Sequence, residues 1–123
     1  MPIIRVEITN IDDANLDAGL LRNLQDSFVA AFGSERRYVD VRVATFGPSR
    51  FLGQYEPGDG PIYVEVTMHT LPEINKRREA AATFSASVAA AIGRDVSAVN
   101  LMLIEAPKDR FAYGGSLLCD LSN

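Results

Sequence analysis

The sequence predicts an α/β (α+β) protein in which two β-α-β units follow one another, giving a four-stranded sheet with two helices on one face. Three observations predict it. Segments of alternating apolar, β-branched residues flank segments whose apolar residues recur at helical spacing. The order strand, helix, strand occurs twice in the 123 residues. The two copies also share residues at matching positions, as a duplicated unit would.

The first unit begins with a β-branched strand over residues 3–9. The polar segment 10–15 follows and offers several helix N-caps. A helix is expected from there up to Gly33, because glycine is the usual residue just past a helix end. A second strand is expected over residues 38–46. The apolar faces of these three elements are Ile4, Val6 and Ile8; Leu20, Leu24, Phe28, Ala31 and Phe32; and Val39, Val41 and Val43.

A glycine-rich segment joins the two units. Residues 47–60 hold four of the nine glycines and two of the six prolines, which is typical of a loop. We therefore expect a single domain, residues 1–123, with pseudo-repeats 2–53 and 61–115 and a linking loop over 47–60.

The second unit opens with a strand that starts at Pro61. Residues 70–73, Thr-Leu-Pro-Glu, have the form of a capping box and predict that a helix runs from there to Gly93. A fourth strand is expected over 98–106, and residues 107–123 suggest a short hairpin and a tail. The expected apolar faces are Ile62, Val64, Val66 and Met68; Ile74, Ala81, Phe84, Val88 and Ile92; and Val99, Leu101 and Leu103.

Matching dipeptides support a duplication. Phe32-Gly33 recurs as Ile92-Gly93 and Arg50-Phe51 recurs as Arg110-Phe111, each at a spacing of 60 residues, while the first strands match at 58. Crossovers of this kind are right-handed and place both helices on one sheet face. Parallel strands are normally covered on both faces, so a partner subunit is expected over the other one. That open face would carry Arg5, Glu7, Asp40, Arg42, Tyr63, Glu65, Thr67, His69, Asn100 and Met102.

Composition excludes several classes. The net charge is −4 with no basic block, which argues against nucleic acid as a partner. No run of 18 apolar residues predicts a membrane span, and the first ten residues lack a signal-peptide pattern. The single cysteine, Cys119, excludes an internal disulfide and fits a cytoplasmic location. The single histidine, His69, has no second ligand at metal-binding spacing, so no metal site is expected.

The start Met1-Pro2-Ile3-Ile4, followed by strand, helix, glycine and strand, resembles the tautomerase superfamily. That superfamily includes 4-oxalocrotonate tautomerase, 5-carboxymethyl-2-hydroxymuconate isomerase, cis-3-chloroacrylic acid dehalogenase and macrophage migration inhibitory factor. The second half, from PIYVEVTM through AVNLMLIEAPKDRFAYGG, is similar to a whole short 4-oxalocrotonate tautomerase subunit. The resemblance covers nearly the whole chain. It implies a fused pair of such subunits, a tautomerase-like fold, a homotrimer and no cofactor.

The resemblance makes Pro2 the catalytic residue, exposed as the amino terminus by removal of Met1. A free α-amino group has a reference pKa of about 7.7–8.0, and burial or a nearby cation lowers it. A neutral amine can then take a proton from a carbon next to a carbonyl group. The matching Pro61 cannot do so, because its nitrogen is an internal amide. Each chain would therefore carry one catalytic amine.

Relatives hold a carboxylate substrate with arginines that are absent here. The short 4-oxalocrotonate tautomerases have one of these arginines in their second strand and one near the start of their helix. The matching second-strand residues are Asp40 in the first half and Asn100 in the second, and the early-helix position falls near Asp12 and Leu71. A doubly charged muconate substrate is therefore in doubt. Arg42 or Arg110 could replace these cations, since arginine binds carboxylates well. A structural ion pair of Arg42 with Asp40 or Glu7 is the alternative that we favour slightly.

Three further residues would shape the pocket. Phe111 matches the aromatic position that lines the pocket in relatives, and Asn100 is expected to shape the pocket as well. Tyr113, two residues further on, could donate a hydrogen bond or be a plain hairpin tyrosine. Arg37 lies in the region of a substrate-binding cation of other members, although a solvated arginine is the simpler interpretation. His69 is expected to be a polar residue on the subunit-facing side.

The sequence thus predicts a tautomerase or isomerase of small 2-oxo or 2-hydroxy-enoic acids. An alternative uses protonated Pro2, either as an acid in a dehalogenase or hydratase of unsaturated acids or as a cation that aids decarboxylation of oxo acids. The Phe-Leu-Gly stretch at 51–53 resembles such relatives, but their paired arginines after the third strand are absent from MHTLPE at 68–73. A third hypothesis is a non-catalytic trimer that binds a ligand in the pocket that is the active site of the relatives. The absence of the family's arginines favours this hypothesis.

Overall fold

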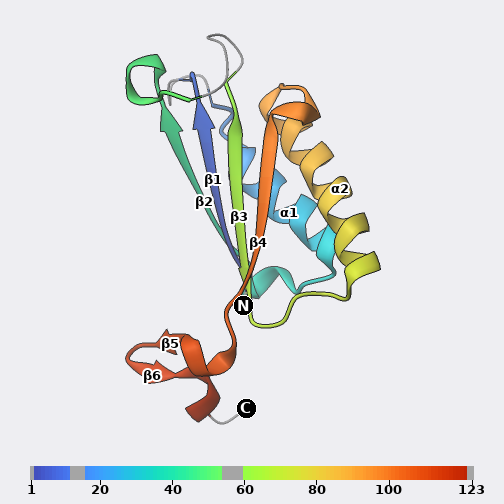
Figure 1. Ribbon diagram of the computed structural model, residues 1–123, viewed down its shortest axis with the longest axis vertical. Coiled ribbons are helices and arrows are strands. Elements are labelled where there is room, and N and C mark those ends of the chain that lie inside the picture. Colours follow the sequence, from blue (N-terminus) through green and yellow to red (C-terminus); the bar gives the residue numbers. More distant parts are fainter. Residues whose placement is uncertain (1, 12–15, 54–59, 122–123) are drawn as a thin grey trace.

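The computed structural model describes residues 2–11, 16–53 and 60–121. Figure 1 shows a twisted sheet with both helices on one face and a small hairpin that projects beyond the end of the sheet. No helix of the described part of the chain is long and apolar enough to cross a membrane. The elements are β1 (Ile3–Thr9), α1 (Leu20–Phe32), β2 (Asp40–Phe46), β3 (Ile62–Met68), α2 (Ile74–Ile92), β4 (Val99–Glu105), β5 (Ala112–Tyr113) and β6 (Ser116–Leu117).

The two β-α-β units form one mixed sheet in the order β2-β1-β3-β4. Within each unit the strands are parallel, as a β-α-β crossover requires, and the units meet through the antiparallel pair of β1 and β3. The predicted α+β class, with four strands and two helices on one face, is confirmed. The sequence carried no signal for the antiparallel contact at the centre.

This register brings distant parts of the chain to the amino end of β1. Ile3 lies opposite Asp40 on β2 and opposite Thr67 on β3. The Asp40 amide donates to the Pro2 carbonyl at 3.0 Å, and the Ala106 amide donates to the Met68 carbonyl at 2.7 Å. Pro2 therefore lies where β2 begins and where β3 and β4 end.

The core lies between the helices and the sheet. Phe28 of α1 packs at its centre, with ring centroids 4.5 Å from Phe32 in a stack and 5.4 Å from Phe84 edge-on. All five apolar positions expected in the first helix are buried, as are those of the first strand. The buried core consists of Ile4, Val6, Ile8, Leu20, Leu24, Phe28, Ala31, Phe32, Val39, Ile62, Val64, Val66, Ala80, Phe84, Val88 and Ala89.

The expected core face of α2 is partly wrong. Ile74 is 48% exposed and Ala81 is only half-buried, whereas Ala80 is buried. The buried stripe steps by four residues from Ala80 through Phe84 to Val88, and the two misplaced residues lie to one side of it.

The expected capping box at 70–73 is also wrong. Glu73 is itself the N-cap of α2, and its side-chain oxygens accept from the Asn75 amide at 3.0 Å and the Lys76 amide at 2.8 Å. Pro72 explains the difference, because the residue before a proline is disfavoured in a helical conformation, so the helix starts only after it.

The other boundaries follow the expectations closely. Both helices end at a glycine in the left-handed conformation, with φ of 76° at Gly33 and 82° at Gly93. The N-cap of α1 is Gly19, whereas the sequence suggested segment 10–15, of which residues 12–15 lie outside the described residues. Short 3-10 turns before β2 and β4 shorten both expected strands. The expected hairpin is present, and residues 54–59 of the linking loop lie outside the described residues.

Candidate functional site

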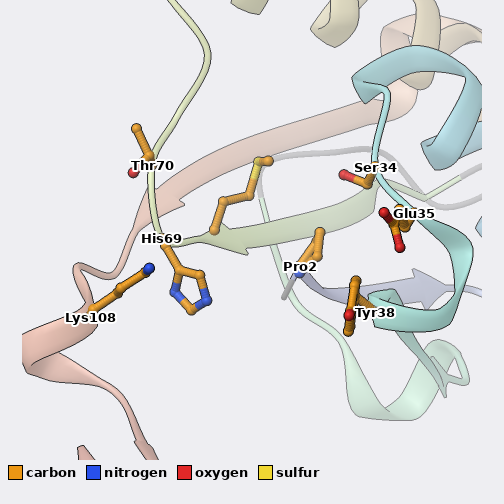
Figure 2. A pocket seen from close by; sticks show the side chains of 8 residues that line it. Pro2, Ser34, Glu35, Tyr38, His69, Thr70 and Lys108 are labelled. Atoms are coloured by element: carbon orange, nitrogen blue, oxygen red, sulfur yellow. The ribbon is translucent and has the colours of Figure 1, made fainter. Parts of the chain in front are cut away.

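A cavity of about 360 Å³ opens beside Pro2. Pro2 itself is buried, and the cavity is lined by side chains from three separate connections of the fold. Figure 2 shows His69, Thr70 and Lys108 on one side of Pro2 and Ser34, Glu35 and Tyr38 on the other. The full lining is Pro2, Ser34, Glu35, Tyr38, Met68, His69, Thr70 and Lys108.

The strand register places these groups together. The segment between α1 and β2 carries Ser34 to Tyr38 and enters β2 beside Pro2. The carboxyl end of β3 carries His69, and the short helix η5 (Lys108–Arg110) follows β4 at the same end of the sheet. The connections from both units thus contribute to one site beside the amino end of β1.

His69 is partly buried and joins the cavity to the hairpin region. Its ring centroid lies 6.2 Å from that of Phe111, edge-on, and Phe111 lies 6.5 Å from Tyr113. The pKa of His69 is lowered mainly by desolvation and next by the positive amino terminus. A backbone hydrogen bond with Ala106 raises this pKa, and the charge of Lys108 lowers it by a smaller amount. The imidazole is therefore mainly neutral at pH 7.

The opposite side of the cavity carries an acid. Arg37 Nε donates to Glu35 Oε2 at 2.9 Å, and the Arg37 guanidinium lies 4.6 Å above the centre of the Tyr38 ring. Arg37 and Tyr38 also line a neighbouring cavity of about 270 Å³, together with Asp40, Tyr113 and Leu118. Tyr38 thus forms part of the wall of both cavities.

Of the predicted pocket residues, Phe111 and Tyr113 contact residues or cavities next to the Pro2 cavity. Phe111 reaches the cavity through its contact with His69, and Tyr113 lines the neighbouring cavity. Arg110 is exposed on η5 and is absent from the lining of the Pro2 cavity.

The remaining two predicted residues lie away from Pro2 within one chain. Arg42 is exposed in the middle of β2, and among the described residues it forms no ion pair, so the predicted pairing with Asp40 or Glu7 is wrong. Asn100 is at the start of β4, whereas the end of β4 adjoins the Pro2 cavity. It lines a cavity of about 360 Å³ with Tyr63, Glu65 and Met102.

The matching proline of the second unit has different surroundings. The Thr9 hydroxyl donates to the Pro61 carbonyl at 2.6 Å, and the Arg94 guanidinium donates to the Gly60 carbonyl at 2.8 Å. Thr9 and Pro61 are both buried. Side-chain and backbone contacts therefore pack closely around the position that would correspond to the cavity.

Sequence reasoning missed Glu35, Tyr38 and Lys108 in the lining of the cavity. Glu35 and Lys108 lie just outside predicted elements, after the glycine that ends α1 and after β4, whereas Tyr38, expected as the first residue of the second strand, instead ends the short helix η2 (Arg36–Tyr38). The parallel pair of β1 and β2 brings Glu35 and Tyr38 to Pro2, but only the antiparallel pairing of β1 with β3 shows that Lys108 of the second unit also lies there. Among the described residues, no group of three or more histidine, cysteine or acidic side chains forms a candidate metal site.

Comparison with known proteins finds similarity in structure alone. No family model matches the sequence, and no curated protein matches it. A fused 4-OT that forms a symmetric trimer superimposes with a TM-score of 0.80 at 19% identity, covering 95% of this chain and 96% of its own. A protein inactivated by 2-oxo-3-pentynoate gives a TM-score of 0.82 at 18% identity, covering 98% and 99%.

A third similar structure is the macrophage migration inhibitory factor of Trichinella spiralis, with a TM-score of 0.76 at 12% identity over 93% of this chain and 97% of that one. These similarities extend over nearly the whole chain. They confirm the tautomerase-like fold that the sequence predicts.

Proposed function

We propose that this protein is an enzyme of the tautomerase superfamily that isomerises small 2-oxo or 2-hydroxy-enoic acids, with Pro2 as the general base once Met1 is removed. The observation that carries the proposal is the position of Pro2. It is buried at the amino end of β1 and lines a cavity with polar side chains on both sides. The shared fold supports the same conclusion.

The cavity provides what proton transfer at carbon requires. Burial of Pro2, and a lysine ammonium in the same cavity wall, would both disfavour the protonated form of a free amine at this position, which would favour the neutral base that the proposal requires. In the enolising direction, the Pro2 nitrogen takes the proton from carbon 3, and the electrons of that bond form the double bond between carbons 2 and 3. The carbonyl oxygen accepts a proton from Tyr38 or from water. In a conjugated substrate, Pro2 then returns its proton to another carbon while the enol oxygen gives its proton back to Tyr38 or to water, and the carbonyl group forms again, which completes an isomerisation.

The proposed enzyme is a homotrimer. The structurally similar fused 4-OT forms a trimer, and one face of the present sheet is uncovered by helices. Phe111, whose ring contacts His69, and Tyr113, whose ring lies next to that of Phe111, would shape the pocket. Arg42, Asn100 and Arg110 would contribute to a Pro2 site only from a neighbouring subunit.

Glu35 supports a second candidate reaction. Its carboxylate lies on the wall of the Pro2 cavity and would stabilise a protonated amine there. A protonated Pro2 would act as an acid in the hydration or dehalogenation of an unsaturated acid, or in the decarboxylation of an oxo acid.

The test compares Pro2→Ala with the matched control Pro61→Ala, in which the second unit loses its corresponding proline. We expect an intact mass without Met1 and ketonisation of the phenylpyruvate enol by the wild type. Pro2→Ala should lower kcat/KM by about 100-fold or more, whereas Pro61→Ala should stay within about threefold.

Other outcomes separate the candidates. A mass that retains Met1 contradicts the amine mechanism. Dehalogenation of 3-chloroacrylate that disappears in Pro2→Ala supports the protonated-proline reaction. Absence of both activities, with a bound carboxylate ligand, supports a non-catalytic binding protein.

A further inference from the structure

We infer that the Pro2 cavity is polarised, with Lys108 binding the single carboxylate of the substrate and Glu35 opposite it excluding a second one. The site would therefore accept monocarboxylic 2-oxo or 2-hydroxy-enoic acids whose tail is neutral. This inference rests on the proposed function and adds the substrate class and its orientation.

Lys108 is the fixed positive charge among the described side chains that line the cavity. The hydrogen bond from the Ala106 amide to the Met68 carbonyl holds the end of β4 against β3, two residues before Lys108. Figure 2 shows the Lys108 side chain on the same side of Pro2 as His69. Because His69 is mainly neutral at pH 7, Lys108 is the group on that side that attracts a carboxylate.

Glu35 gives the other side the opposite charge. Its carboxylate belongs to the wall of the Pro2 cavity, while Arg37, which pairs with it, lines the neighbouring cavity. Arg37 is absent from the lining of the Pro2 cavity, so among the described lining side chains Glu35 is the acid. A second carboxylate on a substrate tail would meet the Glu35 oxygens first, and like charges at short distance repel.

The size and polarity of this side suit a neutral tail. A cavity of about 360 Å³ lies at the small end of ligand-binding pockets. Ser34 and Tyr38 offer hydroxyl groups there, and Tyr38 and Met68 contribute apolar surface to the cavity. With the carboxylate at Lys108, carbon 3 of a short 2-oxo acid would lie toward Pro2, between the two sides.

Two dienoates that differ by one carboxylate provide the test. These are 2-hydroxypenta-2,4-dienoate, with one carboxylate, and 2-hydroxymuconate, with a second at the far end. We expect the wild type to prefer the monocarboxylate at least tenfold in kcat/KM. Lys108→Gln should raise KM for it about tenfold, with kcat changed less. Lys76→Gln, at the other lysine of the chain, is the matched control and should leave both constants unchanged.

Glu35→Gln tests the excluding side. The substitution should raise kcat/KM for 2-hydroxymuconate about tenfold. The variant should therefore prefer the monocarboxylate over the dicarboxylate less strongly than the wild type does. Two results would overturn the inference: a wild type that prefers the dicarboxylate, or a Lys108→Gln variant with an unchanged KM. If activity still requires Pro2 in these experiments, the proposed function remains intact. Activity that survives Pro2→Ala overturns the proposed function.

Binding of unreactive acids gives a second readout that needs no turnover. Crotonate and fumarate have the same carbon chain and carry one and two carboxylates. In amide NMR titrations, we expect crotonate to shift the signals of residues around Pro2 and to bind several-fold more weakly to Lys108→Gln. Stronger binding of fumarate, or crotonate binding that Lys108→Gln leaves unchanged, contradicts the polarised cavity.

Discussion

Gly60 lies at the end of the sheet opposite the Pro2 cavity, where there is no space for a side chain at this position. A Cβ atom at this position would overlap the Thr9 hydroxyl and come within 3.0 Å of Asn10 Nδ2. Thr9 is buried and holds the Pro61 carbonyl, so its side chain has little freedom to move. We predict that Gly60→Ala lowers the free energy of unfolding by about 1–3 kcal/mol, as overpacking of a buried site does, measured by urea denaturation.

A double-mutant cycle with Thr9→Ala identifies the cause. If the overlap with the hydroxyl is responsible, the double variant should be more stable than the sum of the single effects by about 1 kcal/mol or more. Gly19→Ala is the control, because its new Cβ would meet only Asp17 Oδ1 at 3.8 Å. Strictly additive effects of the two substitutions would argue against this explanation.

At the level of single residues, the sequence predicted the catalytic candidate but not its neighbours. Pro2 could be proposed because its position behind Met1 is visible in the sequence. Lys108 and Glu35 could not, since they lie far apart in the chain and meet only through the antiparallel pair of β1 and β3. Arg42 and Asn100 were proposed by matching strand positions, which does not show which subunit's site they approach.

The N-terminus of α2 depends on one carboxylate. Hydrogen bonds from the Asn75 and Lys76 amides lower the pKa of Glu73 below its usual value of 4.5. Since the folded pKa is depressed, this contribution to stability is present above pH 4.5 and is lost as the pH falls through the folded value. We predict that Glu73→Ala lowers Tm by about 2–4 °C at pH 7, and that the difference from wild type shrinks below pH 4.5.

Thermal denaturation followed by circular dichroism at pH 7, 5 and 4 measures this effect. Glu79→Ala removes the same side chain from an exposed position inside α2 and should leave Tm nearly unchanged. A Tm difference for Glu73→Ala that stays constant over this pH range would show that the ionised carboxylate is not the source of the effect.

At the level of elements, periodicity predicted the helices and strands, while local backbone chemistry set their ends. The 3.6-residue spacing identified the buried face of α1 completely. In α2, alanines surround Phe84 and Val88 on several sides, so the apolar pattern leaves the rotation of the helix undetermined. Pro72 then delayed the start of the helix, which the apparent capping box did not indicate.

At the level of the whole molecule, we predict that the open face of the sheet is the contact between subunits. Tyr63 and Met102 are exposed on this face, with side chains 36% and 57% accessible. We predict that the wild type has three times the chain mass of 13.4 kDa in light scattering, and that Met102→Lys dissociates it, because the substitution places a charge in an apolar contact.

Thr83→Lys is the control, since Thr83 is exposed on α2 on the other side of the molecule. This variant should remain a trimer. A wild-type monomer, or a Met102→Lys variant with the wild-type mass, would show that the open face is not the subunit contact. The alternation of strand residues predicted which side chains occupy this face, but not the strand order that spreads them over it.

The packing around Pro61 has a consequence for how this chain can change. In an assembly of identical single units, each substitution near one proline would be repeated near the other. In a chain that carries both β-α-β units the two ends of the sheet vary independently, and here Thr9, Gly60 and Arg94 occupy the end opposite the cavity. That end can accumulate stabilising substitutions that would impair a working site. An open, charged cavity lowers the stability of one end of the sheet, and tight packing at the other end can compensate for this loss. The chain can therefore accept substitutions in the cavity that change its substrate preference.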